Sequence, residues 1–295
     1  MPEAVFQRLT LIGLGLIGSS LARRAMQTGT IAHEIVACDA SPAVCTRARE
    51  LGLAHRVEQD PVAAVAGADC VLLCVPVGAL GAVAAEIMPH LAPGTVLSDV
   101  GSTKQSMLRE ILPILRQDVS LVPGHPLAGT EYSGPDSGFA TLFEGRWCLL
   151  TPPEGTDRNA VAHIQKLWHL CGAMTREMDA AHHDRVLAIV SHLPHLLAFT
   201  ICGTADDLAD ETRDEVLEFA ATGFRDFTRI AASDPVMWRD IFLNNREALL
   251  EMLARFMEDA QAMARAIRWG DESFIVDRIE RGRAIRRSLI EIKQA

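Results

Sequence analysis

The sequence predicts an α/β protein, in which a doubly wound, mostly parallel N-terminal sheet is followed by an all-helical C-terminal domain. Up to about residue 150, short apolar runs rich in β-branched residues alternate with helical segments. These runs are continuously apolar, as in strands that are covered on both faces of a parallel sheet. Beyond about residue 180, strand signals disappear and long amphipathic helices take over. We therefore place two domains at 1–178 and 179–295.

Each predicted element follows from its local pattern. The predicted strands are 9–12, 34–38, 70–75, 95–100, 120–122 and 146–150, and the helices between them include 20–29, 42–52 and 104–115. In the second domain, Asp234 and Pro235 predict a helix start, because a capping carboxylate before a proline is typical of that position. One apolar stripe follows: Met237, Ile241, Ala248, Met252, Phe256, Met263 and Ile267. A single helix of this length needs a partner helix or a second subunit to cover its stripe.

Composition argues against nucleic acid and membranes as partners. The 295 residues include 28 Lys and Arg against 38 Asp and Glu, and no basic block is present. Binding to nucleic acid or to an anionic membrane requires concentrated positive charge. We expect no stretch to reach the length of a membrane span. The seven cysteines are scattered and form no metal motif, which favours the reducing cytoplasm.

A glycine-rich turn predicts a nucleotide site. The run Gly13-Leu14-Gly15-Leu16-Ile17-Gly18 follows an apolar strand and opens a helix. Its glycines permit a tight turn, close approach of a pyrophosphate and close helix–strand packing. Asp39 ends the next strand about 20 residues later, where a carboxylate can accept both ribose hydroxyls and repel a 2′-phosphate. The pattern predicts a Rossmann-like domain that binds NAD, although Arg47 or Arg49 could turn toward the phosphate of NADP.

Further candidate residues follow the later strands. Val75 and Pro76 end one strand, and their loop would pass the nicotinamide-side ribose. Ser102 follows the next strand, and His125 follows the one after, in the Gly/Pro-rich loop 124–131. Because ligands bind at the carboxyl ends of parallel strands, Ser102 and His125 could share a pocket, hold a substrate hydroxyl and remove its proton. Considered alone, His125 is equally well explained as an ordinary loop histidine.

A second histidine pair lies in the predicted helical domain. His192 and His195 are three residues apart and share one helix face, and Pro194 between them should bend that helix. A metal site would need a third ligand, which only the adjacent pair 182–183 offers. We expect no metal, and core packing explains either histidine alone as well as substrate binding does.

Together these motifs resemble the prephenate/arogenate (cyclohexadienyl) dehydrogenase family of tyrosine biosynthesis. The matching segments are 13–18, 99–104, 124–131, 191–195 and 223–231, in order across both domains. The resemblance implies NAD-dependent oxidative decarboxylation of prephenate to 4-hydroxyphenylpyruvate, of arogenate to tyrosine, or of both. Hydride would leave the carbinol carbon as a base takes the hydroxyl proton, and loss of carbon dioxide would make the ring aromatic.

The resemblance also implies roles for individual residues. His125 would deprotonate the ring hydroxyl, and Ser102 would hydrogen-bond to it. Arg229 would bind a carboxylate through two parallel hydrogen bonds. The other implied substrate contacts are His195, Thr130, Glu131, His192 and Arg225, the last of which could equally be a solvated helix arginine. The partners implied are this small molecule and a second copy of the chain, bound through the C-terminal helices.

Two alternatives belong to other classes. A β-hydroxyacid dehydrogenase also joins a Rossmann domain to a helical one, but relies on a lysine–asparagine pair where this chain has 191–195. A regulator that binds NAD without turnover would have no use for Ser102, His125 and Arg229 at the nicotinamide. Both features favour the dehydrogenase that acts on prephenate or arogenate.

Overall fold

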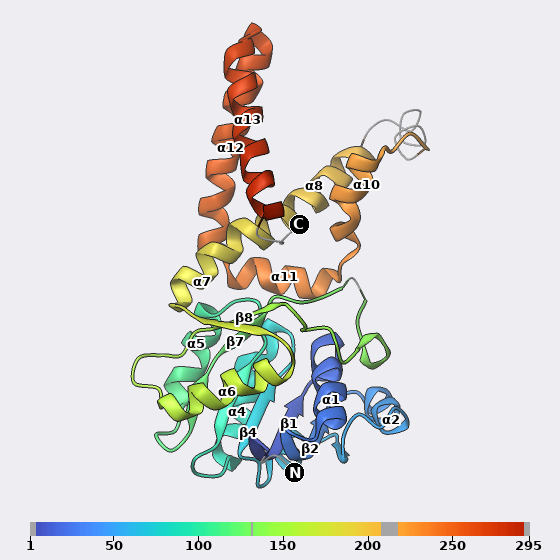
Figure 1. Cartoon of the computed structure of the whole chain (residues 1–295), viewed down its shortest axis with the longest axis vertical. Helices are drawn as coiled ribbons and strands as arrows, with labels where there is room; N and C mark the ends of the chain where they lie inside the picture. Colours follow the sequence, from blue (N-terminus) through green and yellow to red (C-terminus); the bar gives the residue numbers. More distant parts are fainter. Residues whose placement is uncertain (1–3, 131, 208–217, 292–295) are drawn as a thin grey trace. The chain divides into compact units, whose positions relative to one another are not determined.

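The computed structural model describes residues 4–130, 132–207 and 218–291 (Figure 1). The chain forms two compact units, Met1–Arg246 and Glu247–Ala295. The first unit contains the sheet and the helices that follow it as far as Arg246, and the second contains a helical hairpin. The domain boundary that we placed between residues 178 and 179 stays a prediction.

A six-stranded parallel sheet forms the centre of the first unit, in the order β3-β2-β1-β4-β5-β6. Its strands are β1 (Phe6–Ile12), β2 (Ala32–Cys38), β3 (Arg56–Glu58), β4 (Cys70–Leu73), β5 (Val96–Asp99) and β6 (Ser120–Val122). The order reverses between β1 and β4, so the crevice at their carboxyl ends is a place where α/β proteins bind ligands. The predicted doubly wound parallel sheet is confirmed.

Helices cover both faces of this sheet (Figure 1). One face packs against α1 (Leu16–Thr28) and α6 (Arg158–Leu170), and the other against α3 (Pro61–Val65), α4 (Leu80–Ile87) and α5 (Gln105–Ile111). The remaining helical segments of this region are α2 (Pro42–Glu50), η1 (Val77–Ala79), η2 (Met88–His90), η3 (Leu112–Ile114) and η4 (Pro135–Ser137). Because both faces are covered, the central strands are apolar on both sides, which explains their continuous apolar runs.

A second, three-stranded sheet follows. It consists of β7 (Gly124–Pro126), β8 (Trp147–Leu150) and β9 (Met174–Glu177), with β7 antiparallel and β9 parallel to β8. His125 therefore lies in a short strand opposite Leu149, and our prediction that it lies in a loop was wrong. The predicted strand at 146–150 belongs to this smaller sheet. The strand partner of His125 lies more than twenty residues further along the chain. A three-residue strand that depends on such a partner has no recognisable local pattern.

One continuous helical run begins directly after the predicted start of the helical domain at residue 179. It comprises α7 (Ala180–Leu187), the π-helical segment η5 (Ala188–His192) and α8 (Leu193–Asp206). Pro194 lies in the first turn of α8 and cannot donate a backbone hydrogen bond. The wider π-helical turn directly before Pro194 is typical of a helix whose regular backbone hydrogen bonds are interrupted. Such turns are frequent at functional sites.

The same run, Ala180–Asp206, is long and apolar enough to cross a membrane. Our expectation that no stretch reaches that length was therefore wrong. One helix of this kind is weak evidence for a membrane span, because the central helices of globular domains pass the same test. The absence of a membrane partner stays a prediction.

The predicted helix start at Asp234 is confirmed, but the single long helix is not. The Asp234 carboxylate accepts a hydrogen bond from the Met237 amide at 2.8 Å and caps α11 (Pro235–Asn244). At Asn245 the backbone leaves the helical conformation, and α12 begins at Arg246. The buried Asn245 side chain instead donates to the carbonyl of Asp184 at 2.8 Å. This contact with a distant residue ends the helix. The other helical segments here are α10 (Thr222–Thr228) and η6 (Arg229–Ala232).

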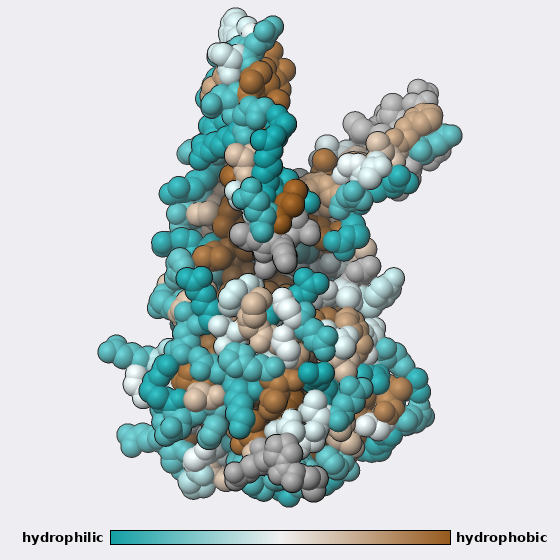
Figure 2. Space-filling view, viewed as in Figure 1, coloured by the Kyte–Doolittle hydropathy of each residue, from teal (hydrophilic) through white to brown (hydrophobic). Residues whose placement is uncertain are grey.

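The second unit is a hairpin of α12 (Arg246–Trp269) and α13 (Glu272–Glu291). Gly270 adopts φ +67° between the two helices, and Asp271 caps α13 by accepting from the Phe274 amide. Arg278 and Asp259 form an ion pair of 2.9 Å across the hairpin. Figure 2 shows hydrophobic residues exposed among hydrophilic ones on these helices. The large ones include Leu250, Phe256, Met257, Ile267, Trp269, Val276, Ile279, Ile285, Leu289 and Ile290.

Candidate active site

The glycine turn has the form that the sequence predicted. Gly13 adopts φ +100°, and a Cβ there would lie 2.6 Å from the carbonyl oxygen of Cys74. A Cβ on Gly18 would overlap the carbonyl of Gly13, so α1 can approach the strand only with glycine there. Gly15 differs, because a Cβ built on it meets nothing within 4 Å. Gly15 therefore leaves open space at the N-terminus of α1, as the approach of a pyrophosphate requires.

The residues between these glycines anchor the turn. Leu14 and Leu16 are buried in the core, and Ile17 is half-buried. Their side chains pack into the domain and leave the backbone of the turn for a ligand.

Asp39 is held beside the turn. Its carboxylate accepts hydrogen bonds from the amides of Leu14 and Ser41, each at 2.9 Å. The two arginines that could serve a 2′-phosphate are engaged elsewhere. Arg47 bonds to Asp136 at 2.6 Å and to Glu50, and Arg49 donates to the Val57 carbonyl at 2.7 Å. The arrangement suits a ribose diol beside Asp39 better than a phosphate.

The loop after β4 meets α11. Val75 is half-buried and Pro76 exposed, and η1 follows directly. A Cβ on Gly78 in η1 would lie 2.8 Å from the carboxylate of Asp240 in α11. The helical region thus packs against the loop that the topology assigns to the nicotinamide side.

A buried ion pair contacts the backbone directly before His125. The Lys104 ammonium lies 2.5 Å from the Asp99 carboxylate and donates to the carbonyl of Gly124 at 2.7 Å. Asp99 in turn accepts from the amide of Gly124 at 3.2 Å. The pair therefore holds both backbone groups of the residue before His125. Ser102, half-buried, lies in the short segment between the two charges. The motif in the sequence indicated this segment, but the ion pair within it was not predicted.

His125 is a buried and neutral imidazole. Its Nδ1 lies 2.9 Å from Nε2 of His183. Burial lowers the pKa of His125 well below its ordinary value, and the nearby Lys104 ammonium and the rings of His183 and His192 act in the same direction. At neutral pH its ring is therefore able to accept a proton.

His183 and Asp184 continue this chain of hydrogen bonds. Nδ1 of His183 lies 2.8 Å from Oδ1 of Asp184, and both side chains are buried. From the sequence, His183 was predicted only as a possible third metal ligand. Its spacing of four residues from the apolar Leu187 on one helix face was the signal that it points inward.

His192 and His195 have different surroundings. The ring of His195 stacks on Trp238 with centroids 3.7 Å apart, and its Nδ1 donates to the Ser191 carbonyl. Burial lowers the pKa of His195, and the positive charge of nearby Arg229 adds to the effect. His192 is fully buried, and its Nδ1 lies 3.0 Å from Nδ2 of Asn245. Only His195 keeps an exposed edge.

Two buried nitrogens beside His195 have unmet hydrogen-bonding capacity. Nε1 of Trp238 and Nε2 of His192 have no partner within the described part of the chain. Because Asn245 donates to Nδ1 of a neutral His192, both unmet atoms carry a hydrogen. Buried donors without acceptors are costly, and they are common where a ligand supplies the acceptor.

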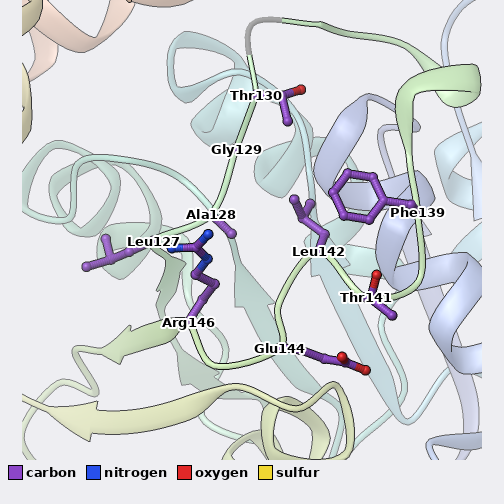
Figure 3. Close-up of a pocket in the computed structure, with 9 residues that line it drawn as sticks. All are labelled: Leu127, Ala128, Gly129, Thr130, Phe139, Thr141, Leu142, Glu144 and Arg146. Carbon is purple, nitrogen blue, oxygen red and sulfur yellow. The ribbon is translucent and has the colours of Figure 1, made fainter. Parts of the chain in front are cut away.

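The other predicted substrate contacts are less constrained. Arg225 lies on α10 and Arg229 begins η6, and both are exposed. Glu131 lies outside the described residues. Thr130 is exposed and lines a cavity of about 300 Å³ together with Leu127, Ala128, Gly129, Phe139, Thr141, Leu142, Glu144 and Arg146 (Figure 3). Of the residues that we predicted to bind substrate, this cavity contacts Thr130 only.

Among the described residues, no group of three His, Cys, Asp or Glu side chains is arranged to hold a metal ion.

Two family models match the chain. Residues 22–177 match the nucleotide-binding domain of prephenate dehydrogenase, and residues 179–280 match the dimerization domain of the same enzyme.

Individual proteins give the same result. A cyclohexadienyl dehydrogenase of Zymomonas mobilis is 41% identical over 287 residues, which cover 97% of each chain. Prephenate dehydrogenase of Bacillus subtilis is 33% identical over 85% of this chain and 67% of its own length. The crystal structure of prephenate dehydrogenase from Aquifex aeolicus, in complex with hydroxyphenyl propionate and NAD+, is similar with a TM-score of 0.89 at 30% identity. That match covers 96% of this chain and 98% of the other.

Proposed function

Because the chain belongs to the prephenate dehydrogenase family, we propose that it oxidatively decarboxylates prephenate, arogenate or both with NAD in tyrosine biosynthesis. The observation that carries the proposal is the buried, neutral imidazole of His125 in the same unit as the glycine turn. A neutral base beside a nucleotide site is what oxidation of an alcohol requires. A sensor that binds NAD without turnover has no need of one.

In the proposed reaction the cofactor accepts the hydride and the protein transfers the proton. Bound NAD+ would supply the hydride acceptor, with the pyrophosphate at Gly15 and the ribose diol at Asp39. His125 takes the proton of the ring hydroxyl, and Ser102 hydrogen-bonds to that oxygen. When the carboxylate leaves as carbon dioxide, the electron pair of the broken bond makes the ring aromatic and places negative charge on the former hydroxyl oxygen. His125 then returns the proton, so the base is regenerated without net proton uptake.

Cationic and polar side chains of the helical region bind the substrate's charged groups. Arg229 and His195 are the primary contacts. They lie close enough that the positive charge of Arg229 lowers the pKa of His195. The buried N–H groups of His192 and Trp238 lie beside His195 and suit an oxygen acceptor. Thr130 contributes a hydroxyl from the segment that follows His125, and Arg225 contributes positive charge one helical turn before Arg229. The predicted contact of Glu131 with the substrate stays a prediction.

The second unit supports association of two copies. Its helices expose many large apolar side chains, and exposed apolar helix faces are typical of subunit interfaces. We propose a homodimer formed through α12 and α13. Five of the seven cysteines are buried, and all seven are free, which favours a reducing, cytoplasmic location.

An absorbance assay for reduced cofactor tests the function. The purified chain is mixed with prephenate or arogenate, and with NAD or NADP, in all four combinations. We expect reduction of NAD with at least one substrate, accompanied by release of carbon dioxide. Absence of cofactor reduction in every combination would contradict the proposal, and reduction without carbon dioxide release would identify a simple alcohol dehydrogenase.

Replacing Asp39 with Ser is expected to weaken discrimination against NADP. Removal of the carboxylate takes away a ribose acceptor and the repulsion of a 2′-phosphate. The ratio of kcat/KM for NAD to that for NADP should fall by about 10-fold, equivalent to about 1.4 kcal/mol. Glu58→Ser is the matched control, because Glu58 lies on the next strand and pairs with Arg56. If Asp39→Ser leaves the ratio unchanged, other residues discriminate between the cofactors.

A further inference from the structure

We propose that His183, held by Asp184, is a positioning residue that keeps His125 in the tautomer with its free lone pair on Nε2. The inference rests on the proposed role of His125 as the base. It explains why the polar side chains of His183 and Asp184 are buried, which core packing alone does not explain.

The direction of the first hydrogen bond follows from Asp184. Its carboxylate accepts from the backbone amides of Lys104 at 2.8 Å and Gln105 at 2.9 Å, at the start of α5. An ionised carboxylate can only accept hydrogen bonds. The contact of 2.8 Å with His183 therefore requires that Nδ1 of His183 carries the hydrogen and donates it.

The direction of the second hydrogen bond follows from the first. Burial lowers the pKa of His183, so the ring is neutral near pH 7, although Asp184 opposes this shift. With its one hydrogen on Nδ1, neutral His183 presents a lone pair at Nε2. The contact of 2.9 Å then makes Nδ1 of His125 the donor. His125 is left with an unprotonated Nε2, the atom that must receive the substrate's proton.

The arrangement also favours the protonated state that forms during turnover. When His125 gains a proton on Nε2, its Nδ1–H still donates to His183, behind which lies the Asp184 carboxylate. A hydrogen bond from a charged donor is stronger than one from a neutral donor. Meanwhile the Lys104–Asp99 pair fixes the backbone of Gly124. Backbone and side chain of the base are thus held by separate contacts.

Three variants test the inference by steady-state kinetics. His183→Leu removes the acceptor, and we expect kcat to fall about 10- to 100-fold, part of the contribution of a general base. The KM values for substrate and NAD should change less than about 2-fold, because a tautomer does not alter binding. His183→Gln can place its side-chain oxygen near the former Nε2 and should recover most of the lost kcat. His182→Leu removes the adjacent exposed histidine and should behave like the wild type.

Nitrogen NMR of histidine-labelled wild-type protein reads the tautomer directly and does not depend on the His183 variants folding. We expect the His125 signals, assigned by their loss in His125→Asn, to show a protonated Nδ1 and an unprotonated Nε2. A protonated Nε2 at neutral pH would overturn the inference. So would a wild-type kcat in His183→Leu, or equal losses of kcat in the Leu and Gln variants.

The kinetics of His125→Asn distinguish a failure of the proposed base from a failure of the positioning role of His183. If His125→Asn retains wild-type turnover, the proposed base is wrong. If His125→Asn is inactive and His183→Leu is fully active, the base stands and only the positioning role fails.

Discussion

Replacing His125 with Asn is expected to lower kcat by about 10²- to 10⁴-fold, the usual contribution of a general base. Asn occupies a similar volume and can still accept a hydrogen bond, but it cannot take a proton at neutral pH. The nucleotide turn is built from other residues, so affinity for NAD should be unchanged. Steady-state kinetics give kcat, and quenching of tryptophan fluorescence or calorimetry gives the dissociation constant for NAD.

The control for this variant is His33→Asn, which changes an exposed histidine on β2. It should retain full activity and stability. Turnover of His125→Asn within a few-fold of the wild type would exclude His125 as the base. A matching loss of NAD affinity would indicate instead that the strand around His125 had been displaced.

Replacing Lys104 with Met is expected to have the largest effect on stability. The substitution leaves the Asp99 carboxylate buried without its cation, and removal of one partner of a buried ion pair costs about 3–5 kcal/mol. It also removes the donor to the Gly124 carbonyl. Denaturant unfolding should show this loss in the free energy of unfolding, and kcat should fall because the strand that carries His125 loses an anchor.

A second substitution distinguishes the buried charge from the lost packing. Adding Asp99→Asn to Lys104→Met removes the uncompensated charge but keeps an acceptor for the Gly124 amide, so part of the stability should return. Activity should not return, because the Gly124 carbonyl still lacks its donor. Arg158→Met breaks an exposed pair with Glu177 and should leave the unfolding midpoint almost unchanged. A Lys104→Met protein as stable as the wild type would contradict this account of the ion pair.

The parts predicted correctly from sequence are those with local causes. Continuous apolar runs predicted the parallel strands, and the spacing of Gly13, Gly15 and Gly18 predicted a turn whose close contacts exclude side chains at two positions. Asp234 was recognised as a helix cap because its partner, the Met237 amide, is only three residues away. In these cases the signal that predicts the element, such as an apolar run, a glycine spacing or a cap, lies within a few neighbouring residues.

The errors have a common physical origin in contacts between distant residues. The helix expected to continue through 245 ends there, because Asn245 bonds to Asp184 and His192, which lie in a different helical segment. His125 lies in a strand because it pairs with Leu149. Neither pairing leaves a trace in the local pattern.

The sequence by itself determined the class of fold, the nucleotide turn and the identity of the candidate base. Only the tertiary structure decided how that base is held, because His125 and His183 are 58 residues apart and Lys104 and Asp184 are 80 apart. Local propensity and periodicity depend on neighbours within a few residues. The proton-accepting state of His125 depends on burial and on partners that only folding brings into contact.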